Sequence, residues 1–196
     1  MKSEVIAVSS QGTGIEAALA QAESIAAEMN LSHRQTLHMR LLVEEMMNMM
    51  CSIIGELEGK FWIETENDKA YRLVLQMKTL MDSEQRAQLL SASTSGKNEA
   101  HRGLMGKLRA FFEPMPVLDT PACLVETLAI PGNENGELTW SLEAYRERLR
   151  KRKEASDEAQ VEWDELEKSV VSHIADNVEV SIRVNDVDLV ISKKLS

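Results

Sequence analysis

The sequence predicts an α+β fold, a two-layer α/β sandwich in which helices cover one face of a mixed, mostly antiparallel sheet. Two regions, 60–77 and 178–195, each contain two runs of alternating apolar and polar residues around a short polar turn, which is typical of β-hairpins. Two segments before the first hairpin, 15–29 and 32–57, repeat their apolar residues at helical spacing. Packing such helices on one face of the sheet buries both apolar surfaces.

The first predicted element is a short strand at 4–9, and Gly12-Thr13-Gly14 ends it. The helix that follows spans 15–29 and is rich in alanine and glutamate. Its apolar residues recur every three or four positions, and Asn30 ends it.

The second helix, from Ser32 to about Leu57, is the longest predicted element. Ser32 is a suitable N-cap, and Gly59 closes the helix at its other end. Its apolar side is rich in methionine, which we interpret as adaptable core filling rather than as a metal or sulfur site. The residues of that side are Met39, Leu42, Val43, Met46, Met47, Met49, Met50, Ile53, Ile54 and Leu57.

The remaining elements alternate between strands, short helices and polar loops. Turn residues, helix caps and prolines set their limits. In order, we predict strands at 60–66 and 71–77 around the turn 67–69, a helix from Asp82 to about Leu90, a loop at 91–98, a helix at 104–112 stopped by Pro114 and Pro116, a strand at 138–142, a charged helical segment at 143–168, and strands at 178–184 and 187–195.

Composition excludes several classes of protein. The chain has 196 residues and a formal net charge of −10, which disfavours a coat for nucleic acid or for an anionic membrane surface. No apolar run approaches the roughly 20 residues that span a bilayer, and the first residues lack the apolar stretch of a signal peptide. Cys51 and Cys123 form no motif and are expected to be free thiols. We therefore expect one cytoplasmic domain over 1–196.

Two polar residues on the long helix form the first candidate site. Glu44 and Asn48 are four residues apart, so their side chains leave the same side of the helix. The same strip continues onto the small residues Cys51 and Gly55, where the flat body of a ligand could lie. The alternative is that Glu44 and Glu45 are simply exposed acids and that Gly55 marks a fraying helix end.

The second candidate is a glycine-rich basic segment at 95–109. It has three glycines and a net charge of +3 inside an acidic chain. Glycine lets backbone N–H groups approach an anion, and the helix beginning near Leu104 favours negative charge at its N-terminus. The segment lacks the spacing of a P-loop and of a dinucleotide-binding fingerprint. A basic surface loop without a ligand is the alternative interpretation.

Together, and in this order, the two segments resemble motifs of the GHKL ATPase superfamily, which includes anti-sigma-factor serine kinases and the catalytic domains of histidine kinases. The run around Glu44 and Asn48 resembles its N-box, and Arg102-Gly103-Leu104 resembles its G2 box and ATP lid. The resemblance covers about residues 1–112, and by size the chain is most similar to the anti-sigma-factor kinases.

The resemblance implies a Mg²⁺–ATP site. Asn48 would offer its amide oxygen to Mg²⁺, and Glu44 would orient or deprotonate the attacking hydroxyl or water. The residues that would wrap the phosphates are Ser95, Gly96, Lys97, Asn98, Arg102, Gly103, Leu104, Gly106 and Lys107.

The family's G1 box, an aspartate followed by glycines after the third strand, is missing here. If Met81-Asp82 corresponds to a later Phe-Asp pair of the anti-sigma-factor kinases, the position that reads adenine falls near Gln76, whose amide could pair with the base. Asp82 is the other candidate for adenine binding, and a helix N-cap is its structural alternative.

These observations predict an ATP-binding regulatory domain, either a serine/threonine protein kinase or an ATPase, with ATP and Mg²⁺ as cofactors. Its expected partner is a regulatory protein of the sigma-factor or anti-sigma-antagonist type, with no nucleic acid and no membrane, and a homodimer is left open. The alternative is a non-catalytic interaction module on a degenerate GHKL-like fold. In that case the charged segment 143–168, which lies within a family-specific insertion or extension at 113–175, would be a docking arm.

Overall fold

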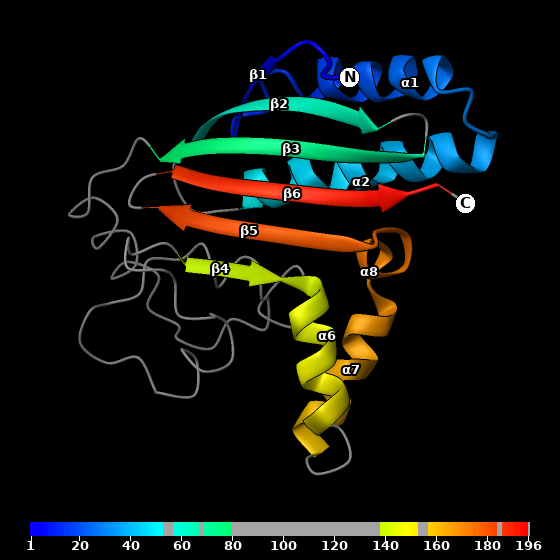
Figure 1. The fold of residues 1–196 in the computed structure, drawn as a ribbon. Coiled ribbons are helices and arrows are strands. Elements are labelled where there is room, and N and C mark those ends of the chain that lie inside the picture. The colour runs from blue at the N-terminus through cyan, green and yellow to red at the C-terminus, as the bar shows by residue number, and fades with distance from the viewer. Residues whose placement is uncertain (53–56, 67–68, 80–137, 153–156, 184–185, 196) are drawn as a thin grey trace.

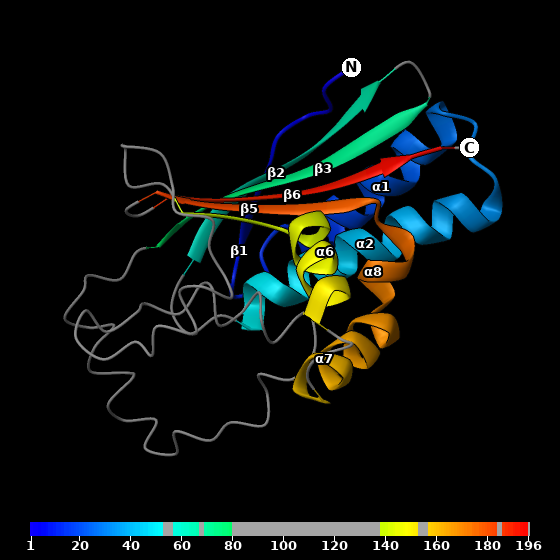
Figure 2. The same cartoon turned by 60° about the horizontal axis from the view of Figure 1, so that its bottom comes forward.

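The computed structural model describes residues 1–52, 57–66, 69–79, 138–152, 157–183 and 186–195. They form a six-stranded sheet with helices on one face, which confirms the predicted two-layer α/β sandwich (Figure 1 and Figure 2). The elements are β1 (Ile6–Ser9), α1 (Ile15–Glu28), α2 (His33–Ser52), β2 (Leu57–Glu66), β3 (Ala70–Thr79), β4 (Leu138–Ser141), α6 (Leu142–Arg152), α7 (Asp157–Lys168), α8 (Val170–Ile174), β5 (Asn177–Arg183) and β6 (Asp186–Lys194).

The strand order is β1-β2-β3-β6-β5-β4, and every one of these pairings is antiparallel. The two predicted hairpins, β2–β3 and β5–β6, meet at the centre, where Leu75 lies opposite Leu189. Because side chains alternate along a strand, odd-numbered residues of β3 such as Leu73 and Leu75 face the helices. The even-numbered residues Arg72 and Gln76 lie on the opposite side, which we call the open face of the sheet.

Helix α2 forms most of the helical layer. Its methionine-rich side is buried against the sheet in one continuous hydrophobic core, as predicted. Met39, Met47 and Met50 have no exposed surface, and neither have Phe61 and Leu73 of the facing strands. The same core reaches residues of β4, α6, α7 and α8, so the described part of 113–175 packs on the same sheet.

The N-terminus of α2 is capped as predicted. The Oγ of Ser32 accepts the Gln35 N–H at 3.4 Å, and the Oε1 of Gln35 accepts the Ser32 N–H at 2.9 Å. This reciprocal arrangement is a capping box. Asn30, which ends α1, has a φ of 52°, a conformation that asparagine tolerates better than most residues.

The predicted C-terminal end of the long helix was wrong. Helix α2 is described to Ser52, Leu57 begins β2, and residues 53–56 lie outside the described ranges. Gly59 does not close a helix but lies inside the sheet, opposite both Val8 and Met77. A Cβ on Gly59 would lie 2.7 Å from the Gln76 carbonyl oxygen, so the close strand approach explains this glycine.

The turn that joins β1 to α1 is hydrogen-bonded to the last residue of β1. The Ser9 N–H donates to the Thr13 carbonyl at 3.1 Å, and the Gly12 N–H donates to the Ser9 carbonyl at 3.0 Å. Gly14 has a φ of 76°, and a Cβ there would lie 2.1 Å from the Ala7 carbonyl oxygen. Only glycine permits both this backbone conformation and this contact.

The charged segment predicted at 143–168 consists of two helices, α6 and α7, that lie side by side and project from the edge of the sheet (Figure 1). Helix α6 is mostly basic and α7 mostly acidic, so the adjacent helices carry opposite charge. Between them, the Tyr145 hydroxyl donates to the Glu162 carboxylate at 3.0 Å. Within α6, the Glu147 carboxylate contacts both Arg150 and Lys151, so part of the charge is paired inside that helix.

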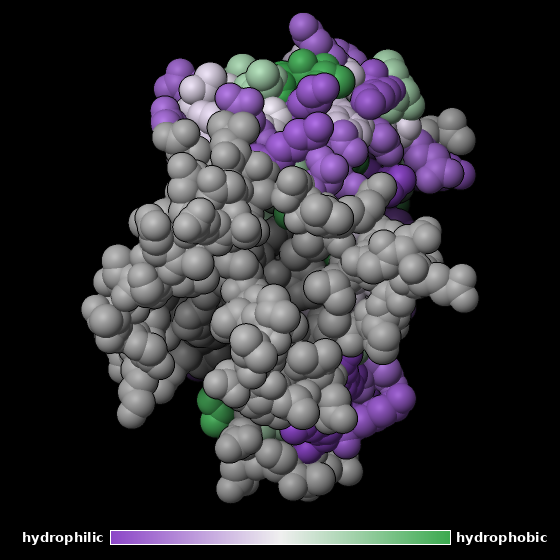
Figure 3. All heavy atoms as spheres, turned by 90° about the vertical axis from the view of Figure 1, so that its left-hand side faces the viewer, coloured by the Kyte–Doolittle hydropathy of each residue, from purple (hydrophilic) through white to green (hydrophobic). Residues whose placement is uncertain are grey.

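None of the helices in the described ranges is long and apolar enough to cross a membrane. The described surface at the end of the sheet where β3 finishes is largely hydrophilic, with a hydrophobic patch at the top of the molecule (Figure 3). The helices predicted at 82–90 and 104–112 and the loop at 91–98 lie outside the described residues.

Candidate functional site

Glu44 and Asn48 lie on the side of α2 that faces away from the sheet. Both side chains are exposed, whereas the neighbouring Val43 and Met47 have no exposed surface. Helical periodicity accounts for this difference, because the methionine-rich side takes one half of the helix and leaves the other to polar groups. The packing of the methionine side against the sheet therefore determines which side of α2 is exposed.

The two side chains are close enough to act on one ligand. Residues four apart on a helix have Cβ atoms about 6 Å apart, within the size of a hydrated cation or a phosphate group. Neither side chain has a hydrogen bond or ion pair with the residues that the structure describes. Cys51, one turn further along the strip, is also exposed, as the predicted strip requires. Gly55 lies outside the described residues.

Gln76 does not belong to this group. It is an even-numbered residue of β3, paired with Lys60 and Asp188, and its side chain is exposed on the open face of the sheet. Gln76 lines a cleft of about 740 Å³ on the open face. Glu44 and Asn48 lie on the outer side of α2, which packs on the opposite face of the sheet. The sheet therefore separates Gln76 from the two helix residues, and the described residues do not form the predicted adenine–metal grouping.

The other predicted ligand residues cannot be placed relative to α2, because they lie outside the described ranges. Within those ranges no group of three or more His, Cys, Asp or Glu side chains could hold a metal ion. The residues outside are Asp82, Ser95, Gly96, Lys97, Asn98, Arg102, Gly103, Leu104, Gly106 and Lys107.

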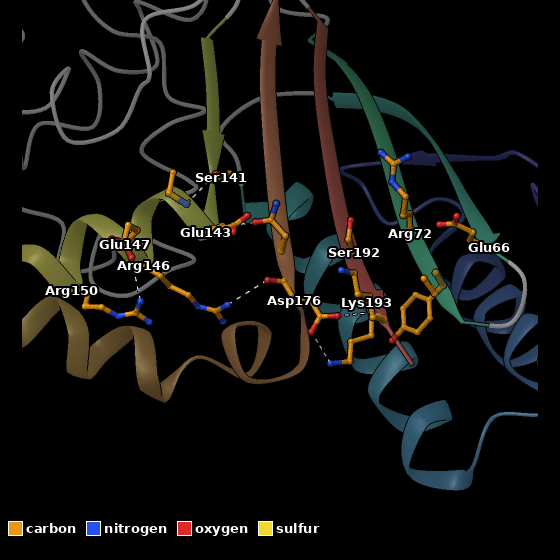
Figure 4. A pocket seen from close by; sticks show the side chains of 15 residues that line it. Glu66, Arg72, Ser141, Glu143, Arg146, Glu147, Arg150, Asp176, Ser192 and Lys193 are labelled. Atoms are coloured by element: carbon orange, nitrogen blue, oxygen red, sulfur yellow. Dashed lines mark hydrogen bonds and ion pairs between the residues drawn. The ribbon is translucent and has the colours of Figure 1, made fainter. Parts of the chain in front are cut away.

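A second cleft, which the sequence did not predict, lies at the other end of the sheet and has a volume of about 980 Å³. It is formed by the start of β3, the end of β6, the start of β5 and the flank of α6. Arg146 and Arg150 line one wall, Arg72 lies across from them, and Asp176 and Lys193 lie between (Figure 4). We call it the arginine cleft.

Asp176 organises the floor of the arginine cleft. Its carboxylate accepts the Lys193 ammonium at 3.1 Å and the Lys194 backbone N–H at 2.5 Å (Figure 4). Burial alone would raise the pKa of Asp176, but these two hydrogen bonds and the lysine charges outweigh it and hold the pKa below its usual range. Asp176 is therefore ionised and joins the start of β5 to the end of β6.

Arg146 ties α6 to the end of α8. Its guanidinium donates to the carbonyl oxygens of Ser172 and, at 3.4 Å, Asp176. Burial lowers the pKa of Arg146, and the Asp176 charge partly opposes this effect. Carbonyl groups at a helix C-terminus attract cations, so the contact holds α6 beside the cleft.

The sequence carries little signal for the arginine cleft. Its charged residues come from four separate elements and form no motif, and Arg146 and Arg150 are part of a charge run that is typical of a solvated helix. The i, i+4 spacing of these two arginines does predict that they share one side of α6. Their position opposite Arg72 depends on the strand order.

Comparison with known proteins identifies no family for this chain. No protein-family model matches it, and no curated protein is significantly similar.

Proposed function

We propose that the chain is a regulatory domain that binds Mg²⁺ and an adenine nucleotide, as its resemblance to the GHKL superfamily implies, with Glu44 and Asn48 forming part of the site. The observation that carries the proposal is the pairing of an exposed carboxylate and an exposed amide on one strip of α2. The helix is fixed by its buried methionine side, so the two groups are held on a rigid element.

The chemistry of these two side chains fits the proposed ligand. Mg²⁺ prefers oxygen ligands and usually keeps several waters, so one protein oxygen together with nucleotide phosphates makes a sufficient set. Asn48 would supply that oxygen. Glu44 would orient a water or a substrate hydroxyl toward the terminal phosphate, for hydrolysis or for transfer to a serine or threonine of a regulatory protein of the sigma-factor or anti-sigma-antagonist type.

Cys51 offers a direct test of where the nucleotide binds, because its thiol is exposed one turn beyond Asn48. In a Cys123→Ser background, Cys51 is the single thiol of the chain. We expect Mg²⁺–ATP to slow alkylation of Cys51 by a maleimide, and we expect EDTA or Asn48→Ala to abolish this protection. Equal alkylation rates with and without millimolar Mg²⁺–ATP would contradict the proposal.

Glu44→Ala separates binding from chemistry. Glu44 is exposed, so this variant should fold, bind nucleotide and lose turnover. Measurements of nucleotide binding and of phosphate release on the same sample distinguish the two roles. If binding and turnover both persist, Glu44 is not the catalytic group, although the binding proposal stands.

A non-catalytic interaction module is the second candidate. It is favoured by the α6–α7 pair, which projects from the sheet and carries Val161 with 58% of its surface exposed (Figure 1). This candidate predicts no nucleotide binding at millimolar concentration and association with a protein partner that is lost on Val161→Glu.

A further inference from the structure

The outer side of α2 carries two leucines as well as the polar pair. Leu37 and Leu41 lie on the side of the helix that also carries Glu44 and Asn48. Leu37 has 47% of its surface exposed, and Leu41 is half-buried. Single exposed leucines are common on protein surfaces, so these two alone do not indicate a binding partner. The charged residues that flank them supply the second observation.

Arg34 and Glu44 flank the two leucines at equal distances. Arg34 lies three residues before the first leucine, and Glu44 lies three residues after the second. Both side chains are exposed, and neither has a hydrogen bond or an ion pair to any residue that the structure describes. By contrast, Arg40 on the same helix pairs with Glu23 of α1. Arg34 and Glu44 are about 15 Å apart along the helix, at 1.5 Å per residue, so they cannot pair with each other.

These four residues are complementary to themselves when the helix is reversed. If a second α2 lies antiparallel on the first, with a twofold axis at the level of residue 39, Leu37 is level with Leu41 of the second copy. Arg34 is then level with Glu44 of the second copy. A twofold axis repeats every contact, so one dimer contains two such ion pairs around four leucines. A parallel arrangement would instead put like charges beside each other, which is unfavourable.

The neighbours of α2 would take part in the same contact. Helices α1 and α8 both contact α2, so a second copy seated on the outer side of α2 would also meet them (Figure 2). Val170 of α8 has 47% of its surface exposed and adds apolar area. Asn48 is level with residue 30 of the second copy, before its α2 begins at His33. Asn48 and Cys51 therefore lie outside the paired stretch.

We propose that the chain forms a twofold-symmetric dimer by antiparallel pairing of α2 with α2 of a second copy, with the leucines at the centre and Arg34 of each copy beside Glu44 of the other. The net charge of −10 opposes association of two copies, and the two ion pairs offset part of this repulsion. Each copy would place a cation next to the candidate site of the other, one turn from Asn48. The dimer requires no nucleotide, so its test is independent of the proposed function.

Sedimentation velocity of the full chain without nucleotide measures the association directly. Samples that range from low micromolar to several hundred micromolar should show a concentration-dependent equilibrium between monomer and dimer. A chain that stays monomeric over this whole range would overturn the proposal. A dimer alone does not locate the interface, so the charge of the two flanking residues is changed next.

Arg34→Glu and Glu44→Arg form a complementary pair of variants. Each one alone turns both ion pairs of the dimer into like-charge contacts and should raise the dimer Kd at least about tenfold. An equimolar mixture of the two variants should regain the dimer, because each supplies the charge that the other needs. The two positions are too far apart on one helix for this rescue to occur within a single copy. If the mixture stays monomeric, or if neither single variant weakens the dimer, the proposed pairing is wrong.

Leu37→Glu and Val5→Glu test the apolar centre with a matched control. Both residues are exposed, at 47% and 43% of their surface, and both changes replace an apolar side chain with a negative charge. Val5 precedes β1 in the sheet layer, away from α2. Leu37→Glu should abolish the dimer, whereas Val5→Glu should dimerise as the wild type does. Equal weakening in both variants would show a general effect of added charge and would contradict the α2 interface; circular dichroism verifies that every variant is folded.

Discussion

Replacing Gly14 with alanine tests how closely the start of α1 packs against β1. The backbone of Gly14 has a φ of 76°, and a Cβ there would lie 2.1 Å from the Ala7 carbonyl oxygen. A left-handed conformation costs a residue with a side chain about 1–2 kcal/mol. The contact is far shorter than a van der Waals contact and involves backbone, so β1 and α1 must also move apart. We expect Gly14→Ala to lower the free energy of unfolding by about 3–4 kcal/mol in total.

Gly12→Ala is the matched control for this prediction. Gly12 lies in the same turn with a φ of 94°, but nothing lies within 4 Å of a Cβ built there. It should lose only the conformational part, about 1–2 kcal/mol. Urea denaturation followed by circular dichroism measures both losses, and an unchanged m value verifies that the comparison is valid. Equal losses in the two variants would refute the close packing of β1 on α1.

Three further predictions test other parts of the structure. Ser32→Ala removes the capping box of α2 and should cost about 1 kcal/mol in urea denaturation, and a loss near zero would contradict the cap. Folding lowers the pKa of Asp176, so its ionised carboxylate stabilises the folded state by about 1 kcal/mol. This stabilisation is fully present above the unfolded pKa of about 3.9 and is lost as the pH falls through the folded pKa. Asp176→Asn should therefore be less stable than the wild type at neutral pH, with a difference that shrinks on acidification; a pH-independent difference would exclude this origin. Gln76→Ala should leave nucleotide affinity unchanged in calorimetry, and a clear loss would return Gln76 to the site.

The sheet and the main helices could be predicted from the sequence because their patterns are local. Apolar residues at every second position, Leu73, Leu75 and Met77, predict a strand with one face in the core, and the methionine spacing of α2 predicts a helix with one buried side. The same alternation puts Gln76 on the opposite face from Leu75.

The misplaced helix end has a different cause. Apolar residues continue at helical spacing through Leu57, and Gly59 then has the position of a typical helix-ending glycine. In the structure, Gly59 is required by the approach of the Gln76 carbonyl from the neighbouring strand. The sequence alone does not distinguish a glycine that ends a helix from a glycine that lets a neighbouring strand approach closely. The approaching carbonyl belongs to a residue that is distant along the chain.

The two sites differ in how far the sequence reveals them. Glu44 and Asn48 lie one turn apart, so helical geometry predicted their common exposed strip, and the structure places them on it. The arginine cleft joins Arg72, Arg146 and Asp176, whose proximity follows from the strand order and from α6 beside β5. Non-local proximity of this kind leaves no motif.

The most direct test of the proposed function is a calorimetric titration of the full chain with ATP in the presence and absence of Mg²⁺, repeated with Asn48→Ala. We expect ATP to bind with an affinity that falls at least about tenfold when Mg²⁺ is removed or when the Asn48 amide is lost, the effect of losing one charge-assisted contact. His33→Ala, an exposed residue at the other end of α2 and outside the capping box pair, controls for effects on the helix. Absence of binding at millimolar ATP, or binding that is indifferent to both Mg²⁺ and Asn48, would contradict the proposal.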